Sequence, residues 1–220
     1  MTEAPAWLPL SLVAGLFLTA AVLSLTTNWR MRFGVLAVQY GLSATLMAPA
    51  VIWQVAAVKG AVGLLVVIIL LISAQGVLGT RGAPGPGPNP AALFGLAALR
   101  RIHFQTNLPF RVVAVVLGTV AAWIFVTQMG VAVPGLSLAL NLAGVELILL
   151  SLISLGLTDE PMSAGIALLM LLNGFELLYA PVERSLTVAG LLAAVNFGVA
   201  LAVSHLVWLR YAETERGGLE

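Results

Sequence analysis

Seven long apolar stretches constrain this sequence more than any other feature. A helix needs about 20 mostly apolar residues to cross a bilayer, and it suits lipid because it pairs its own backbone polar groups. The candidate segments are residues 7–26, 32–48, 51–76, 111–129, 133–157, 162–180 and 186–209. The second is short, and Pro49 predicts a break between it and the third. We therefore predict an all-α, polytopic integral membrane helix bundle with about seven transmembrane helices, or six if segments two and three form one re-entrant unit.

The composition agrees with a membrane protein. Hydrophobic residues make up 60% of the chain and charged residues 9%, and the mean hydropathy is +1.06. A soluble domain carries roughly 25% charged residues, so we expect the lipid bilayer to surround this chain. The net charge of +1 without a basic cluster argues against a nucleic-acid partner. The start of the chain has no Lys or Arg before Trp7 and no clear cleavage site, so we expect the first helix to be retained.

Arginine placement predicts the orientation. With the N-terminus outside, eight arginines fall in or beside inside connections, and only Arg184 falls outside. The inside set is Arg30, Arg32, Arg81, Arg100, Arg101, Arg111, Arg210 and Arg216. Inside loops of membrane proteins carry an excess of Lys and Arg. This bias predicts an N-out, C-in protein.

The chain divides into four parts. Residues 1–76 form a first group of three helices, 77–110 a cytoplasmic loop, 111–132 a linking transmembrane helix, and 133–220 a second group of three helices. The loop contains a Gly- and Pro-rich stretch at 82–90, which favours neither helix nor strand. Residues 91–104 then predict a short amphipathic helix at the membrane interface. It either docks to a neighbouring subunit or is held to lipid headgroups by its arginines.

The two groups of three helices resemble each other and predict a parallel internal repeat. The matches, in chain order, are Leu25-Thr26 with Leu157-Thr158, Gly34 with Gly165, Ala48-Pro49 with Ala180-Pro181, and Ala56-Ala57-Val58-Lys59 with Ala193-Ala194-Val195-Asn196. The single linking helix keeps both groups in the same orientation, and parallel repeats occur in transporter folds. Lys59 and Asn196 are therefore expected at equivalent depths.

Three ionisable residues lie inside predicted spanning segments: Glu146, Glu176 and Lys59. An ionisable group at the bilayer centre costs about 2.5–3.5 kcal/mol on insertion scales, so such groups usually face the protein interior and serve ion or proton movement. Asn173 lies three residues before Glu176 and shares its helical face. Gly174 between them predicts close approach of another helix.

Our candidates for proton transfer are Glu146, Glu176, Lys59, Asn173 and Asn196. Glu176 is the principal candidate, and Lys59 either pairs with a carboxylate of this chain or of another subunit, or extends its ammonium group toward the interface. His205 either extends the relay or is a hydrogen-bonded structural histidine. The alternative for the whole set is structural, because polar side chains also hold membrane helices together.

Signatures of soluble enzymes are missing from the sequence. It contains no phosphate-binding glycine loop, no dinucleotide fingerprint after a strand and no His/Cys cluster. With two histidines on distant segments, a haem or zinc site is not expected in this chain. We therefore predict no catalytic centre, cofactor or metal of its own.

Segments five to seven resemble the small three-helix (chain 4L-type) membrane subunit of respiratory complex I and its relatives in cation/proton antiporters. The resemblance is carried by Gly174-Phe175-Glu176-Leu177-Leu178, which is similar to that family's Gly-Leu-Glu motif, and by Ala193-Ala194-Val195-Asn196. The family carries a second glutamate where this chain has Asn196. Because an amide has no titratable proton, a relay of two glutamates does not carry over intact.

Over residues 25–210 the chain resembles the membrane component E family of formate-hydrogenlyase-type hydrogenases. This resemblance is carried by Gly34 and Gln39, by Lys59 and by Asn173-Gly174. It implies a multi-pass subunit of a prokaryotic cytoplasmic membrane that transfers protons laterally. Its partners would be other integral membrane subunits, which are antiporter-like or anchor a quinone or hydrogenase module. Iron–sulfur, quinone or hydrogenase metal centres would lie in those partners.

Two other functions fit the same residues. The chain can be a stand-alone secondary transporter, which should transport when purified alone into vesicles. It can also be a scaffold subunit that packs against partners without moving protons. In that case substitutions at Glu146, Glu176 and Lys59 affect assembly only.

Overall fold

The computed structural model of the chain describes residues 7–26, 28–79, 108–183 and 185–217. All regular secondary structure in these ranges is helical. The helices are α1 (Trp7–Leu25), α2 (Trp29–Met47), α3 (Trp53–Gly79), α5 (Leu108–Thr127), α6 (Leu138–Gly156), α7 (Pro161–Tyr179) and α8 (Leu186–Gly217). The predicted helical class is confirmed. The predicted interfacial helix at 91–104 lies outside the described residues.

Local sequence explains where several helices begin. The side chain of Asn28 caps α2 by accepting a hydrogen bond from the backbone N–H of Arg30 at 3.2 Å. Ser137 caps α6 in the same way, accepting from Leu140 N–H at 3.3 Å. Such caps satisfy backbone donors that have no partner inside the helix. Pro161 opens α7, where its missing N–H costs nothing.

The connection between α5 and α6 is longer than the sequence predicts, so α6 begins at Leu138 rather than at 133. Gly130 and Gly135 adopt positive φ angles of 67° and 86°, which turn the chain out of a helix. The side-chain oxygen of Asn141 accepts a hydrogen bond from the N–H of Val133 at 2.7 Å. Asn141 therefore ties this connection to α6.

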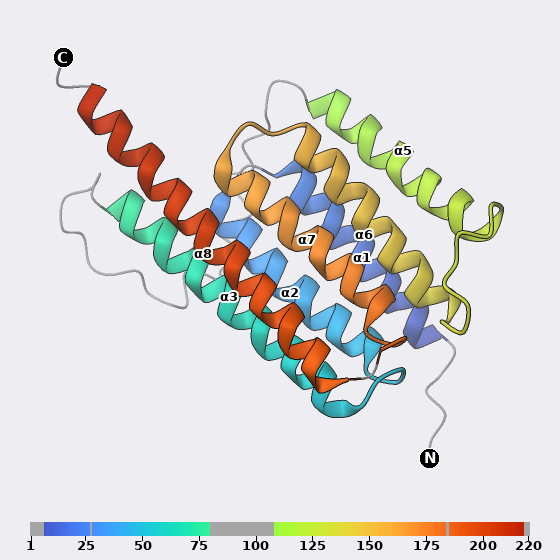
Figure 1. Ribbon diagram of the computed structural model, residues 1–220. Coiled ribbons are helices and arrows are strands. Elements are labelled where there is room, and N and C mark those ends of the chain that lie inside the picture. Colours follow the sequence, from blue (N-terminus) through green and yellow to red (C-terminus); the bar gives the residue numbers. More distant parts are fainter. Residues whose placement is uncertain (1–6, 27, 80–107, 184, 218–220) are drawn as a thin grey trace.

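The helices form two packed rows, with α5 at one side (Figure 1). In one row α2 packs between α1 and α3, and in the other α7 packs between α6 and α8. Across the rows, α1 contacts α6, α2 contacts α7 and α3 contacts α8. Helix α5 packs mainly on α6 and therefore lies at the edge of the bundle.

Polar residues with nearly constant sequence separation meet across the two rows. The Ser24 and Ser154 hydroxyls lie 2.7 Å apart, and Ser43 donates to the side-chain oxygen of Asn173 at 2.8 Å. The hydroxyl of Ser73 lies 3.4 Å from the carbonyl oxygen of Ser204. These contacts join residues 130 or 131 positions apart in all three helix pairs. Paired helices therefore run in the same direction.

Glycines bring α6 and α7 into close contact. A Cβ atom added to Gly174 would lie 2.8 Å from Leu147 Cβ and 2.9 Å from the carbonyl oxygen of Gly144. Neither neighbour can accept an atom at that distance without moving. The predicted close approach of a helix at Gly174 is confirmed.

Five of the described helices are long and apolar enough to cross a membrane by length and composition. The spans are Trp53–Gln75, Leu108–Thr127, Leu138–Gly156, Pro161–Tyr179 and Leu186–Leu209. The apolar stretch of α1, Pro9–Leu25, is shorter, and α2 is less apolar. The predicted break near Pro49 is confirmed, because α2 ends at Met47 and α3 begins at Trp53. These helices indicate a multi-pass membrane protein.

Candidate functional site

A buried ion pair joins α3 to α7. Lys59 on α3 donates a hydrogen bond from Nζ to Oε2 of Glu176 on α7. Their side chains are only 4% and 8% exposed. The ammonium group of Lys59 therefore does not extend toward the interface but pairs with a carboxylate of its own chain.

Helices α8 and α2 complete the surroundings of this pair. Asn196 on α8 donates from Nδ2 to Oε1 of Glu176 and to the carbonyl oxygen of Leu192, the latter at 3.0 Å. Tyr40 on α2 donates its hydroxyl to Asn196 Oδ1 at 2.8 Å. We call Tyr40, Lys59, Glu176 and Asn196 the Lys59–Glu176 cluster. Lys59 and Asn196 thus contact the two oxygens of one carboxylate, although they are 137 positions apart, whereas the Ser73–Ser204 contact between the same two helices joins residues 131 apart.

The chemistry of the Lys59–Glu176 cluster suits proton exchange. Every polar side-chain group in it is hydrogen-bonded, and two of its members can each take and release a proton. Because Lys59 and Glu176 are in direct contact, a proton can move between ammonium and carboxylate without any large motion. Asn196, which is itself held by the Tyr40 hydroxyl, binds the other oxygen of the carboxylate.

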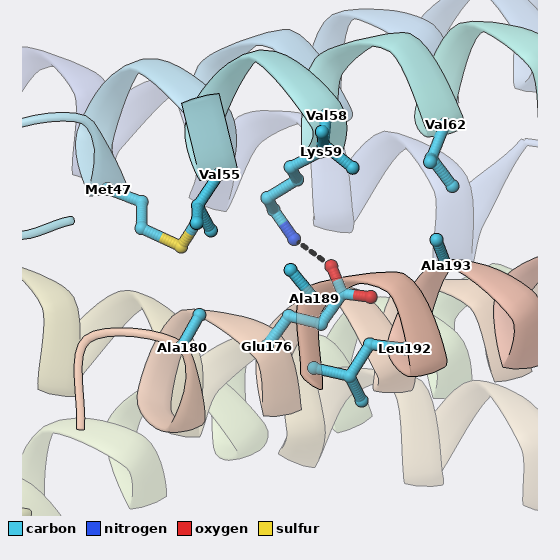
Figure 2. Close-up of a pocket in the computed structure, with 10 residues that line it drawn as sticks. All are labelled: Met47, Val55, Val58, Lys59, Val62, Glu176, Ala180, Ala189, Leu192 and Ala193. Atoms are coloured by element: carbon cyan, nitrogen blue, oxygen red, sulfur yellow. Dashed lines mark hydrogen bonds and ion pairs between the residues drawn. The ribbon is translucent and has the colours of Figure 1, made fainter. Parts of the chain in front are cut away.

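The Lys59–Glu176 pair lines a small pocket of about 30 Å³ between α3 and α8 (Figure 2). Its wall also contains the last residue of α2, residues near the N-termini of α3 and α8, and Ala180 just after α7. The apolar members are Met47, Val55, Val58, Val62, Ala180, Ala189, Leu192 and Ala193. Thus the buried pair faces a space that is otherwise apolar.

Asn173 and Gln39 lie in the same interior, between α2 and α7. Asn173 is fully buried and accepts the hydrogen bond of Ser43, while its Nδ2 has no hydrogen-bond partner among the described residues. Gln39, one turn before Ser43 on α2, is also fully buried, and neither its Oε1 nor its Nε2 is paired within the described part of the chain. Polar groups therefore continue from Glu176 along this helix interface.

Glu146 occupies a different place. It is 1% exposed on α6, and its Oε1 accepts a hydrogen bond from Thr119 of α5 at 3.1 Å. Its Oε2 is buried without a partner among the residues described. No hydrogen bond or ion pair in the described ranges joins Glu146 to the Lys59–Glu176 cluster. Both glutamates are shielded from lipid, as the sequence predicts, but they do not form one site.

His205 is also apart from the cluster. It lies nine residues after Asn196 on α8, which is about 13 Å along a helix. Its side chain is exposed and stacks on Trp208 with 6.4 Å between ring centroids. The structure does not bring His205 together with Glu176.

Two arginines, one buried and one partly buried, make contacts at the opposite end of the bundle that were not predicted from the sequence. Arg32 is 8% exposed inside α2 and donates to Ser163, whose hydroxyl donates to Glu160 at 2.6 Å. Arg111 donates to the carbonyl oxygens of Ser24 at 3.1 Å and Leu157 at 2.6 Å. Arg111 therefore binds carbonyl groups at the C-terminal ends of α1 and α6.

Tyr40 and Thr119 were missed as well. Tyrosine in membrane helices is usually found at the interface, so a tyrosine in the middle of α2 was the available signal for Tyr40. Thr119 carries no comparable signal, because threonine often bonds to its own helix backbone.

Within the described residues, no group of three or more His, Cys, Asp or Glu side chains could hold a metal ion. Comparisons of the chain with protein-family models, curated proteins and solved structures find no match.

Proposed function

We propose that this chain is an integral subunit of a multisubunit membrane complex and that it moves protons, or another monovalent cation, through the Lys59–Glu176 cluster. The observation that carries the proposal is the buried Lys59–Glu176 ion pair in a protein whose helices suit a lipid bilayer. Ionisable residues in such positions are rare and mark ion and proton pathways. A lateral path to neighbouring subunits follows from the resemblance to complex I and hydrogenase membrane subunits.

The proposed topology has seven transmembrane helices, with the N-terminus outside and the C-terminus inside the prokaryotic cytoplasmic membrane. The eight-to-one arginine bias supports this orientation. The parallel repeat is supported by contacts between residues 130 or 131 positions apart, since the first three matches in the sequence have offsets of 131 or 132; the match of Lys59 with Asn196 has an offset of 137. In this topology Glu176 lies in the outer half of the membrane.

Glu176 is the principal proton carrier in this proposal, with Lys59 as its exchange partner. Asn196 positions the carboxylate, and Asn173 continues the polar interior toward Gln39. Glu146 is a second carrier nearer α5, which needs water or another group to connect it with Glu176. Redox centres belong to the partner subunits.

A scaffold role is the second candidate. It is favoured by the way in which the cluster links four helices through paired polar groups. In that case the pair would stabilise helix packing and nothing would pass through it.

Glu176→Gln in the intact native membrane tests the relay. Glutamine keeps the size of the side chain and removes its titratable group. We expect proton pumping to fall at least tenfold relative to electron flow, while Glu183→Gln, an exposed residue after α7, pumps normally. If Glu176→Gln pumps normally in a fully assembled complex, the relay role is refuted and the scaffold role is favoured.

Purification from native membrane tests the assembly. We expect large antiporter-like chains and an iron–sulfur module to accompany this protein. If it purifies alone and transports protons in vesicles, the subunit proposal is wrong.

A further inference from the structure

Two fully buried amide side chains at the interface of α2 and α7 have unpaired polar atoms. Within the described ranges, neither Oε1 nor Nε2 of Gln39 has a hydrogen-bond partner, and the same is true of Nδ2 of Asn173. Both residues are 0% exposed. A side-chain amide offers two N–H donors and an oxygen with two acceptor sites. Most of the hydrogen-bonding capacity of these two residues is therefore not used by protein groups in these ranges.

Ser43 relates the positions of the two amides. Its hydroxyl donates to Oδ1 of Asn173 at 2.8 Å, and Gln39 lies four residues before Ser43 on the same face of α2. Four residues of helix rise about 6 Å. A water molecule that bonds to two groups spans about 5–6 Å, because each hydrogen bond is about 2.8–3.0 Å long. The step along α2 from the level of Asn173 to Gln39 therefore suits a bridge of one water molecule.

Water fits these atoms better than an ion does. Neither side chain carries a charge that could balance a buried ion, and two of the three unpaired atoms are N–H donors, which do not bind a cation. Water both donates and accepts, so it can bond to the two nitrogens and to Oε1 of Gln39. In folded proteins, buried polar groups without a protein partner are usually bonded to ordered water, which makes about three such bonds.

We infer that Gln39 and Asn173 bind ordered water between α2 and α7, beside Ser43. The inference goes beyond the proposed function and does not depend on it, because the hydrogen bonding of the two amides alone calls for the water. Asn173 is three residues before Glu176, so the site lies about one turn of α7 away from the ion pair. The water joins α2 to α7 next to the Lys59–Glu176 cluster without being a member of it.

Oxidation of a buried methionine can detect this water. Radiolysis converts bound water into hydroxyl radicals, which oxidise the side chains beside them, while detergent scavenges radicals that form outside the protein. The reporter is Met170, which is 1% exposed and precedes Asn173 by three residues on α7. Because α2 and α7 run in the same direction and Ser43 meets Asn173, Met170 lies at the level of Gln39.

The experiment irradiates the full chain in detergent micelles and follows methionine oxidation by mass spectrometry. We expect Met170 to be oxidised in the unsubstituted protein and at least fivefold more slowly in Gln39→Leu, which removes one amide that holds the water. Gln54→Leu is the matched control and should leave the rate unchanged, since Gln54 is exposed on α3. Met47, which is also 1% exposed, is the reference in each protein. If Gln39→Leu does not fold, Asn173→Leu replaces it.

Two results would overturn the inference. If Met170 is not oxidised in the unsubstituted protein, no water lies beside it, and the two amides bond to each other or remain unpaired. If Met170 is oxidised equally in the unsubstituted protein and in Gln39→Leu, other groups hold the water.

A double-mutant cycle tests whether both amides hold the same water. We expect Gln39→Leu and Asn173→Leu to be coupled by at least fivefold in the equilibrium constant of unfolding, because either change alone already releases the shared water. Changes that act independently would show that the two residues share no ligand, which also overturns the inference.

Discussion

The Lys59–Glu176 pair makes a quantitative prediction about stability. Both side chains are almost completely buried, and Glu176 accepts hydrogen bonds from Lys59 and Asn196 alone within the described part of the chain. Lys59→Met therefore leaves a buried carboxylate with one amide donor, and Glu176→Met leaves a buried ammonium group. Removing one partner of a buried pair typically costs about 3–5 kcal/mol of unfolding free energy.

The double variant Lys59→Met/Glu176→Met should cost much less than either single change. Methionine is close to both side chains in length, and replacing a buried pair by apolar residues is often neutral or stabilising. The neighbours keep other partners, since Asn196 still donates to Leu192 and accepts from Tyr40. We expect a coupling energy of about 3 kcal/mol or more between the two sites, which is over a hundredfold in the folding equilibrium.

The assay is reversible unfolding in mixed detergent micelles, followed by helical circular dichroism for the four members of the cycle. Single changes that each cost less than about 1 kcal/mol, or that simply add in the double variant, would refute the reasoning. Such a result means that the two groups are solvated or separated in the folded protein.

Three further changes test the packing. Gly174→Ala should lower the free energy of unfolding by roughly 2 kcal/mol or more, because the new methyl group meets backbone atoms of α6. Gly198→Ala is the control: its methyl group enters open space, so it should raise the free energy of unfolding, by less than about 1 kcal/mol. Equal effects of the two changes in a thermal melt would contradict this. Tyr40→Phe should cost about 1 kcal/mol through loss of the bond to Asn196, and an unchanged melt counts against that bond. Thr119→Val should cost a similar amount by leaving Glu146 without its donor, while a stabilised variant would show that the carboxyl group has another partner.

The sequence predicted where the helices lie along the chain better than it predicted which face of each helix meets which neighbour. The lengths of the apolar stretches and the position of Pro49 predicted the helices. The observed helix ends differ from the predicted ones mainly where a glycine at positive φ or a capping residue determines the end. Spacing within one helix also placed Asn173 and Glu176 in the interior. Both depend on local chemistry that is visible in the chain.

The pairing of polar side chains between helices was not visible in the same way. One sequence gives the face that a residue shares with its own helix, but not the helix that this face meets. Lys59 therefore had several alternatives, and the structure selects Glu176. For the same reason Glu146, at a suitable depth, turned out to contact Thr119 on α5 rather than the cluster.

The most direct test of the proposed function is proton pumping by the complex that contains Lys59→Met/Glu176→Met. This variant removes both titratable groups, and the apolar replacement is expected to preserve folding and assembly. The proposal predicts electron flow with proton pumping reduced at least tenfold, measured as protons moved per electron in native vesicles. Normal pumping by the assembled double variant would contradict it and leave the ion pair as a structural contact between helices.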